Sequence, residues 1–315
     1  MATISEIYIP DYNGTQNFYA NETEPHSKVH MNTYRAIRRC INSIPFPVTA
    51  KQYWTFHEFT EELKDKELCS AESWDLIRAK HPHFIIPATR DAWLRSLSDL
   101  KDGQDASLQA RAREIADLAR RRNITRIHSV GVGSAGLEYF IKKCEPSLRM
   151  TVSDYNPAGV ERLQQVFTEC DCITRFDMMQ PDWRSMGGGG ASDALVLMFR
   201  LEPHFTNWQW RSIFKNMAQS CVRNVLFIPH NIMTVRSYYQ LIIRILRARL
   251  SGHALAFTGY IRNDKMYPKL WDNYYASESM VFGYMQSFLL TLAEHTHKSN
   301  QESRNLAKQL NCELR

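Results

Sequence analysis

The feature that most constrains the fold is the stretch from Thr125 to Tyr139, TRIHSVGVGSAGLEY, where a short apolar run meets three glycines and then helix-forming residues. This pattern predicts a strand, a tight turn containing Gly131, Gly133 and Gly136, and the first turns of a helix. Glycine suits the turn because it accepts backbone angles that a side chain resists, and because a ligand can then contact bare main chain. The chain is therefore expected to form a doubly wound α/β sheet with an open crevice at this turn.

A second strand is predicted over LRMTVSD, Leu148 to Asp154, after the intervening helix. Asp154 closes it eighteen residues beyond Gly136, where a carboxylate can accept both hydroxyls of a ribose. The alternative is that Asp154 only caps the helix begun by Asn156 and Pro157. The spacing G-x-G-x-x-G is weakly specific by itself, and a nicotinamide dinucleotide would use the same turn and the same acid.

The next two predicted strands separate these ligand classes. The third, CITRFD, ends in Asp177 and is followed by Met178, and the fourth, within Asp193 to Phe205, runs into a polar and aromatic loop. This succession resembles the class I S-adenosylmethionine-dependent methyltransferases. The resemblance covers roughly residues 105 to 292 and implies a mostly parallel, seven-stranded, doubly wound sheet with an N-terminal helical extension.

The resemblance also implies a set of site residues with S-adenosyl-L-methionine as cofactor. Gly131 and Gly133 would hold the methionine part, Asp154 the ribose, and Asp177 with Met178 the adenine. The loop from Phe199 to His204 would border the methyl group and the substrate.

The chain departs from the family pattern at two positions of the glycine turn. Family members usually carry an acid where this chain has Ser129 and a glycine where it has Ala135. The first change removes a negatively charged partner for the methionine amine. Two alternatives therefore stay open: an NAD(P)-dependent oxidoreductase that keeps Gly136 as its third glycine, and a non-catalytic binding protein of the same fold.

Methyl transfer from a sulfonium is an in-line displacement, so most of the acceleration comes from holding the acceptor at near-attack distance. Candidate catalytic residues must follow the carboxyl ends of the strands, and Glu202 and His204 do so after the fourth. His204 is the first choice for a base because an unperturbed imidazole titrates near neutrality. The alternatives are that His204 caps the helix near Thr206 and that Glu202 pairs with Arg200.

The acceptor is expected to be a small molecule, with oxygen slightly ahead of nitrogen as the acceptor atom. No Asn-Pro-Pro-Tyr or Asp-Pro-Pro-Tyr follows the fourth strand, which in the family would indicate an amino group of adenine or glutamine.

The remaining segments suggest three regions: an N-terminal arm and helical lid over residues 1–103, the cofactor-binding domain over 104–293, and a C-terminal tail over 294–315. Amphipathic spacing predicts helices over residues 31–44 and over AKQYWTFHEFTEEL, the second capped by Thr49 with Gln52 in a capping box. The aromatic side chains of the second either pack on neighbouring helices or wall a substrate cavity; they are Tyr53, Trp54, Phe56 and Phe59.

Further helices are predicted over residues 104–122 and 231–250, both amphipathic. The arginines of the first, Arg111 among them, are expected on a solvated face. A sixth strand is predicted over Leu255 to Ile261, and residues 279–292 are expected to supply an antiparallel last strand between the fifth and the sixth.

Composition excludes several classes. A net charge of +6 with no concentrated basic face gives no strong nucleic-acid signal. Seven scattered cysteines form neither a disulfide framework nor zinc-ligand spacing, so no metal and a reducing, cytoplasmic location are expected. No apolar run reaches the roughly 18 residues of a membrane span, so no membrane partner is expected. The oligomeric state does not follow from the sequence.

Overall fold

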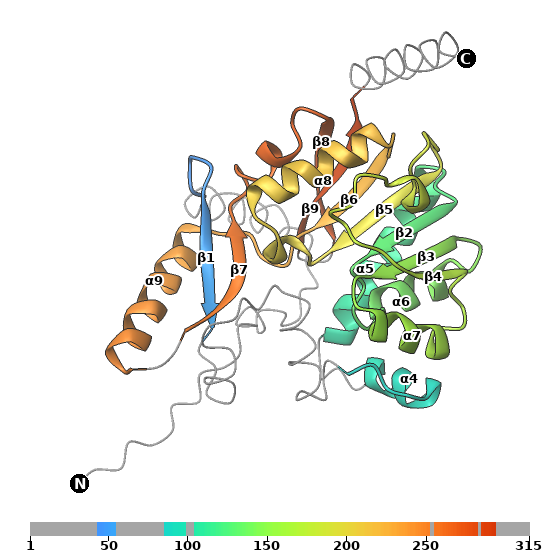
Figure 1. Cartoon of the computed structure of the whole chain (residues 1–315), viewed down its shortest axis with the longest axis horizontal. Helices are drawn as coiled ribbons and strands as arrows, with labels where there is room; N and C mark the ends of the chain where they lie inside the picture. The colour runs from blue at the N-terminus through green and yellow to red at the C-terminus, as the bar shows by residue number, and fades with distance from the viewer. Residues whose placement is uncertain (1–42, 55–84, 99–103, 253–254, 283–284, 294–315) are drawn as a thin grey trace, which may run out of the picture. The chain divides into compact units, whose positions relative to one another are not determined.

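The computed structural model of the chain describes residues 43–54, 85–98, 104–252, 255–282 and 285–293 (Figure 1). The chain divides into two compact units, Met1–Ser43 and Ile44–Arg315, and all described residues except Ser43 belong to the second. The helix expected over 31–44 lies outside the described residues except for Ser43 and Ile44, which are not helical; Phe56, Phe59 and the tail 294–315 lie wholly outside them.

A seven-stranded sheet in the order β4-β3-β2-β5-β6-β9-β8 forms the centre of the described unit (Figure 1). Five of its strands run parallel: β2 (Arg126–Val130), β3 (Arg149–Asp154), β4 (Cys172–Arg175), β5 (Ala194–Phe199) and β6 (Asn224–Ile228). The strand β9 (Met285–Leu292) runs antiparallel between β6 and β8 (Tyr275–Phe282). The predicted mostly parallel, seven-stranded sheet is confirmed, and an antiparallel last strand lies beside the fifth as expected. Its other neighbour is β8, to which residues 279–282 belong, and not the predicted sixth strand.

Helices bury both faces of this sheet, as a doubly wound fold requires. Alternate residues of β5 point to opposite sides: Leu195 and Leu197 are buried with α4 to α7, whereas Val196 and Met198 are buried with α8. These helices are α4 (Arg90–Ser98), α5 (Gln104–Arg121), α6 (Gly136–Cys144), α7 (Pro157–Val166) and α8 (Asn207–Gln219). Strand β5 is thus buried on both faces, which explains its continuous apolar run, ALVLMF.

The predicted sixth strand forms, but in a different sheet. Strand β7 (Ala256–Arg262) pairs antiparallel with β1 (Thr49–Trp54) in a separate two-stranded sheet, and β8 takes the edge position of the large sheet. The sequence pattern of a strand predicts that a segment is extended, but it does not predict which strand pairs with it. At Gly259 an added Cβ would lie 2.3 Å from the carbonyl oxygen of Pro203, so β7 is pressed against the loop after β5.

The helix predicted to start at Thr49 is wrong for its first residues, because Thr49–Trp54 is β1. The Thr49 hydroxyl makes no capping box with Gln52; it accepts a hydrogen bond from the Asn207 side-chain amide at 3.0 Å. Pairing with β7 outweighs the local helical signal. Tyr53 then packs edge-on against Phe257 at 6.0 Å between ring centroids.

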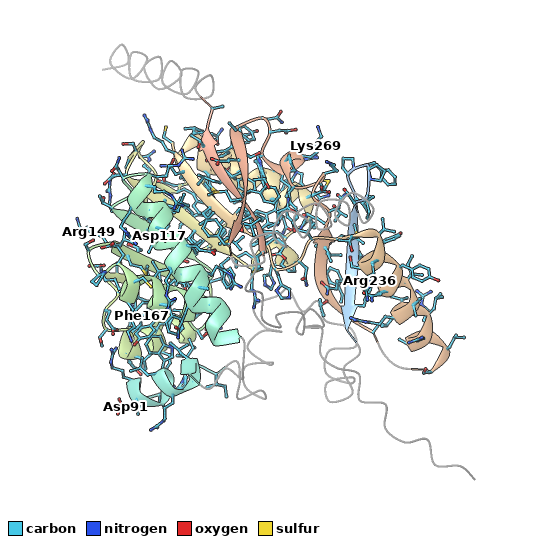
Figure 2. The ribbon with its side chains drawn as sticks, turned by 180° about the vertical axis from the view of Figure 1, so that it is seen from behind. Asp91, Asp117, Arg149, Phe167, Arg236 and Lys269 are labelled. Atoms are coloured by element: carbon cyan, nitrogen blue, oxygen red, sulfur yellow. The ribbon has the colours of Figure 1, made fainter. Side chains whose placement is uncertain are left out.

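The described part of the expected N-terminal lid is integrated with the sheet unit and does not form a separate body. Trp93 of α4 is fully buried, with its ring 5.3 Å from that of Tyr139 and 5.4 Å from that of Phe167, which Figure 2 labels. Its indole N–H donates to the carbonyl oxygen of Ser134 at 2.9 Å. The division into an arm and lid over 1–103, a cofactor-binding domain over 104–293 and a tail over 294–315 stays a prediction.

Candidate functional site

The three glycines of the first turn have three different neighbours. At Gly131, φ is +65° and an added Cβ would lie 2.4 Å from a methyl carbon of Leu201, so the loop after β5 packs directly on it. At Gly136 an added Cβ would lie 3.1 Å from Leu97 of α4. At Gly133, φ is +55° and the Cβ position opens onto empty space. Helix packing therefore explains Gly136, loop packing explains Gly131, and only Gly133 offers bare main chain to a ligand.

Asp154 connects this turn to the end of β3. Its carboxylate accepts hydrogen bonds from the Gly133 N–H at 3.1 Å and from the Asn156 N–H at 2.9 Å. The cap of α7 is Asn156, whose side-chain oxygen accepts from the Gly159 N–H at 2.7 Å, so capping that helix is not the role of Asp154. Each carboxylate oxygen has more than one acceptor direction, so a polar ligand can share the group with the turn.

A buried acid that sequence reasoning missed lies behind Ser129. The Ser129 hydroxyl donates to the carboxyl of Glu138 at 2.7 Å, and both side chains are buried. Burial raises the pKa of Glu138 to about 7, and the Ser129 hydrogen bond opposes that rise. Its position in the first turn of α6 was the available signal, since such residues face back toward the preceding strand and turn.

The loop after β5 brings Glu202 and His204 to this edge of the sheet. The Glu202 carboxylate accepts from the main-chain N–H groups of His230 at 2.6 Å and of Asn231 at 3.2 Å. Its second oxygen, Oε2, is buried without a hydrogen-bond partner among the described residues. Glu202 therefore joins the loops after β5 and β6 and keeps one oxygen uncommitted there.

Burial moves the pKa values of these two residues in opposite directions. Burial raises the pKa of Glu202 to about 7. Burial lowers the pKa of the His204 imidazole to about 4, although the nearby Asp154 carboxylate opposes the fall. The cap of α8 is Thr206 in a capping box with Gln209, so His204 does not cap that helix. Near neutral pH, Glu202 is the better matched proton acceptor and His204 is a neutral, weakly basic ring.

Phe199, at the end of β5, has two guanidinium groups close to its ring. The centroid of its ring is 5.3 Å from the Arg111 guanidinium carbon and 5.1 Å from that of Arg200. The expectation of a solvated face is wrong for Arg111, which is fully buried, and holds for Arg113 and Arg120 to Arg122, which are exposed. The amphipathic pattern places Arg111 outside the apolar face, but contact with the ring of Phe199 stabilises its guanidinium in the interior.

Asp177 and Met178 follow β4 and face different surroundings. Asp177 is exposed, and its carboxylate accepts from the Met179 N–H at 2.9 Å. The Met178 side chain is buried in the core cluster that also contains Phe176 and Trp183. The roles expected for both residues at a ligand stay predictions, with Asp177 the more accessible of the two.

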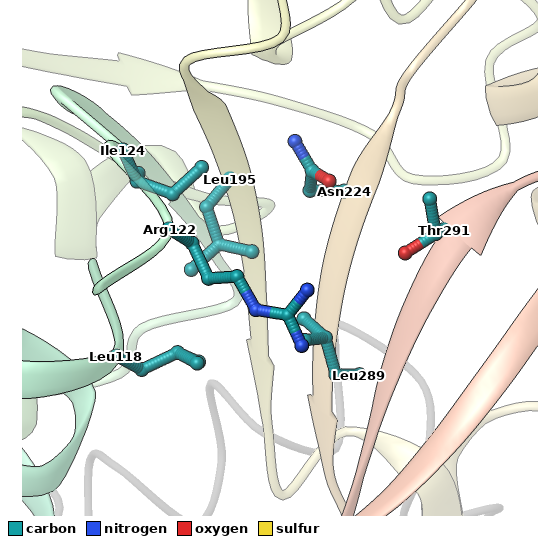
Figure 3. Close-up of a pocket in the computed structure, with 7 residues that line it drawn as sticks. All are labelled: Leu118, Arg122, Ile124, Leu195, Asn224, Leu289 and Thr291. Carbon is teal, nitrogen blue, oxygen red and sulfur yellow. The ribbon is translucent and has the colours of Figure 1, made fainter. Parts of the chain in front are cut away.

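The small pocket in Figure 3 lies at the opposite edge of the sheet, at the amino ends of β5 and β6. Its polar residues already have structural partners: Arg122 pairs with Glu278 at 2.8 Å, and the Asn224 amide donates to the carbonyls of Ser192 and Ala194. We assign no function to it. Within the described part of the chain, no group of three or more His, Cys, Asp and Glu side chains could hold a metal ion.

Comparison with known proteins gives structural neighbours of low similarity. No family model and no curated protein matches the chain. The mitomycin 7-O-methyltransferase MmcR matches with a TM-score of 0.44 and 15% identity over 70% of this chain and 60% of its own. Human N-acetylserotonin methyltransferase, in complex with SAM, matches with a TM-score of 0.43 and 12% identity over 87% of this chain and 100% of its own.

A third neighbour is the magnesium protoporphyrin IX methyltransferase ChlM from Synechocystis PCC 6803, with bound SAH, at a TM-score of 0.42 and 16% identity over 64% of this chain and 94% of its own. Similarity this low carries no conclusion about function. The fold rests on the strand order given above, and the function rests on the site.

Proposed function

We propose that the chain binds S-adenosyl-L-methionine at the turn from Gly131 to Ala135 and transfers its methyl group to a small-molecule acceptor. The observation that carries this is the pairing of Gly133 with Asp154, where open main chain lies hydrogen-bonded beside a carboxylate at adjacent strand ends. A ligand there gains van der Waals contact with the turn and a charged acceptor for its hydroxyls.

Glu138 supplies the negative charge that the resemblance placed at residue 129. In this proposal the ligand's amine is attracted by the buried carboxyl, and the Ser129 hydroxyl lies between the two, 2.7 Å from Glu138. A cation nearby favours the ionised carboxylate and so lowers the pKa of Glu138 from about 7. In this proposal the acid that the family carries at the position of Ser129 is replaced by Glu138. The presence of Ser129 is then no argument for the non-catalytic alternative.

Asp154 holds the ribose, Asp177 lies by the adenine and Phe199 borders the reacting centre. The residues that surround the sulfonium hold the acceptor in line with the methyl group, and water is excluded by the packed loops after β5 and β6. Where the acceptor arrives protonated, Glu202 takes the proton at its uncommitted Oε2, and neutral His204 orients the acceptor by hydrogen bonding.

The strand order argues against the dinucleotide alternative. Dinucleotide-binding sheets carry a sixth strand parallel to the fifth, whereas β9 runs antiparallel beside β6. The sheet therefore supports S-adenosylmethionine over a nicotinamide cofactor.

Calorimetry with four ligands tests the proposal: S-adenosylmethionine, S-adenosylhomocysteine and the two nicotinamide dinucleotides. We expect both S-adenosyl ligands to bind the full-length chain and both dinucleotides to fail. Asp182→Ala is a matched control for Asp154→Ala, because Asp182 is exposed and lies outside the site. Binding of a dinucleotide alone would establish the oxidoreductase alternative, and binding of none of the four would refute a cofactor site of either kind.

A further inference from the structure

The helix α9 (Val235–Leu250) leaves a row of large apolar side chains exposed, whereas α8 exposes Trp208 and buries Trp210, Ile213, Phe214 and Met217. Val235 is 47% exposed, Tyr239 64%, Leu246 52% and Leu250 87%, and Ile242 continues the row. At about 100° per residue these five positions fall within an arc of about 80° on one side of the helix. We call this row the α9 stripe.

Arginines border the α9 stripe on both sides. The helix contains four of them and neither aspartate nor glutamate. Around the helix, Arg236 and Arg247 follow the stripe on one side, and Arg249 lies beside Ile242 on the other. Figure 2 labels Arg236 on this helix.

The start of α9 is fixed to the rest of the described unit. Thr234 caps the helix in a capping box with Ser237, and the Met233 N–H just before it donates to the carbonyl of Arg262 at 2.7 Å. The side of the helix away from the stripe packs towards β1 and buries Ala248. The stripe is therefore presented by an anchored helix of about 22 Å, at about 1.5 Å per residue, and not by a fraying end.

We propose that the α9 stripe lies in the surface of an anionic lipid bilayer. An exposed apolar row flanked by basic residues is the pattern of helices that lie flat at the boundary between headgroups and acyl chains. Val235, Ile242 and Leu246 would enter the acyl boundary, Tyr239 would sit at headgroup level, and the arginine heads would reach the lipid phosphates. None of the described helices is long and apolar enough to cross a bilayer, and a helix lying flat needs no such length.

A second copy of the chain fits the stripe less well than a lipid surface does. Two α9 helices in contact through their stripes would place three arginines of each chain, Arg236, Arg247 and Arg249, around one interface, with no acid on either helix. Like charges brought together oppose association, and the net charge of +6 adds to this. An anionic lipid surface supplies the opposite charge over the whole length of the helix.

Sedimentation of the full-length chain with vesicles tests the proposal. We expect it to bind phosphatidylcholine vesicles that contain phosphatidylserine, and to bind pure phosphatidylcholine vesicles far less. Raising the salt from about 0.1 M to about 1 M shortens the Debye length from about 10 Å to about 3 Å and should release most of the bound protein. Replacing Arg236, Arg247 and Arg249 together by glutamine should weaken binding on the order of 100-fold.

Matched controls separate the stripe from general charge and general exposure. Replacing Arg113, Arg121 and Arg149 by glutamine also lowers the net charge from +6 to +3 at exposed positions outside α9, and should leave most of the binding intact. Leu246→Asp should reduce vesicle binding at least about tenfold, whereas Trp208→Asp, at a 72% exposed residue of α8, should not.

Three results would overturn the proposal. One is equal binding to both vesicle types. Another is an equal loss of vesicle binding in the two triple arginine variants. The third is a dimer in lipid-free solution that Leu246→Asp dissociates. A Leu246→Asp chain that fails to fold, as judged by circular dichroism, leaves the decision to the arginine triples. The cofactor titration reads out separately, so either proposal can fail alone.

Discussion

Replacing Glu138 by glutamine should stabilise the protein at alkaline pH and weaken its hold on the cofactor. Glutamine keeps the shape of the side chain and an oxygen that accepts from the Ser129 hydroxyl, so the change removes mainly the ionisable group. The same substitution at Glu161, on the exposed side of α7, serves as the control.

The sign follows from a pKa that folding raises. The carboxyl of Glu138 moves from an ordinary value of 4.5 to about 7, so the folded chain keeps a proton that the unfolded chain releases. Its contribution to stability is complete below about pH 4.5 and is lost as the pH rises through about 7. At about 1.4 kcal/mol per pH unit, the full loss is about 3 kcal/mol.

Urea unfolding of both chains at pH 5 and pH 8.5 measures this difference. The Glu138→Gln chain should match the wild type within about 1 kcal/mol at pH 5 and exceed it by up to about 3 kcal/mol at pH 8.5. Glu161→Gln should show no such dependence. Two results would refute a raised pKa for Glu138: a Glu138→Gln chain that is less stable than the wild type at pH 8.5, or a difference in free energy of unfolding that is the same at both pH values.

The more stable chain should nevertheless bind the cofactor less well. If Glu138 offsets the charge of the ligand's amine, its loss should weaken S-adenosylhomocysteine binding by about 1.5–3 kcal/mol, the range for a hydrogen bond to a charged group. Calorimetry at pH 8.5 measures this directly. Unchanged affinity would remove Glu138 from the site while leaving its effect on stability untouched.

Four other substitutions and one truncation test the site and the core. Gly131→Ala should destabilise the fold by about 1–3 kcal/mol, because the added methyl meets Leu201. Gly133→Val should abolish S-adenosylhomocysteine binding with a smaller shift in the thermal melt. Equal shifts in melting temperature would contradict the assignment of Gly131 to packing and Gly133 to the ligand. Asp154→Ala should weaken that binding by about 1.5–3 kcal/mol and also lower stability, since two main-chain N–H groups lose their acceptor; unchanged affinity in a folded chain would disprove the assignment. Trp93→Ala should lower the free energy of unfolding by about 3–5 kcal/mol in urea titration, and a chain beginning near Asp102, which lacks Trp93, should melt early; a sharp wild-type melt in either would show that α4 is dispensable.

Much of the fold could be predicted because the residues that end its strands lie next to those strands in the sequence. Strands β2 to β5 each end in a glycine, an acid or a polar loop that follows a short apolar run, and the sequence carries all of these signals. The partner of a strand is a long-range property, which is why β7 was assigned to the wrong sheet. At Thr49–Trp54 a plausible capping box gave way to pairing with β7, a contact between residues about two hundred positions apart.

The candidate site was predictable by position and less so by chemistry. Strand ends place Asp154, Asp177 and the loop at Glu202 and His204 at one edge of the sheet, as expected. Proton affinity depends on burial, which no spacing rule supplies: burial raises the pKa of Glu202 and lowers that of His204. Glu138 was not predicted because it lies nine residues beyond Ser129 in sequence, and only the fold of the turn brings its carboxyl to the Ser129 hydroxyl.

Hydrogen–deuterium exchange with and without S-adenosylhomocysteine tests the central claim most directly, because it reports where the ligand binds. Saturating ligand should slow exchange in peptides covering residues 129–138, 152–157 and 199–205. Peptides covering 119–124 and 287–292, around the pocket at the opposite edge, should exchange unchanged. Protection confined to that opposite edge, or no protection in the presence of a ligand that calorimetry shows to be bound, would contradict a cofactor site at the glycine turn.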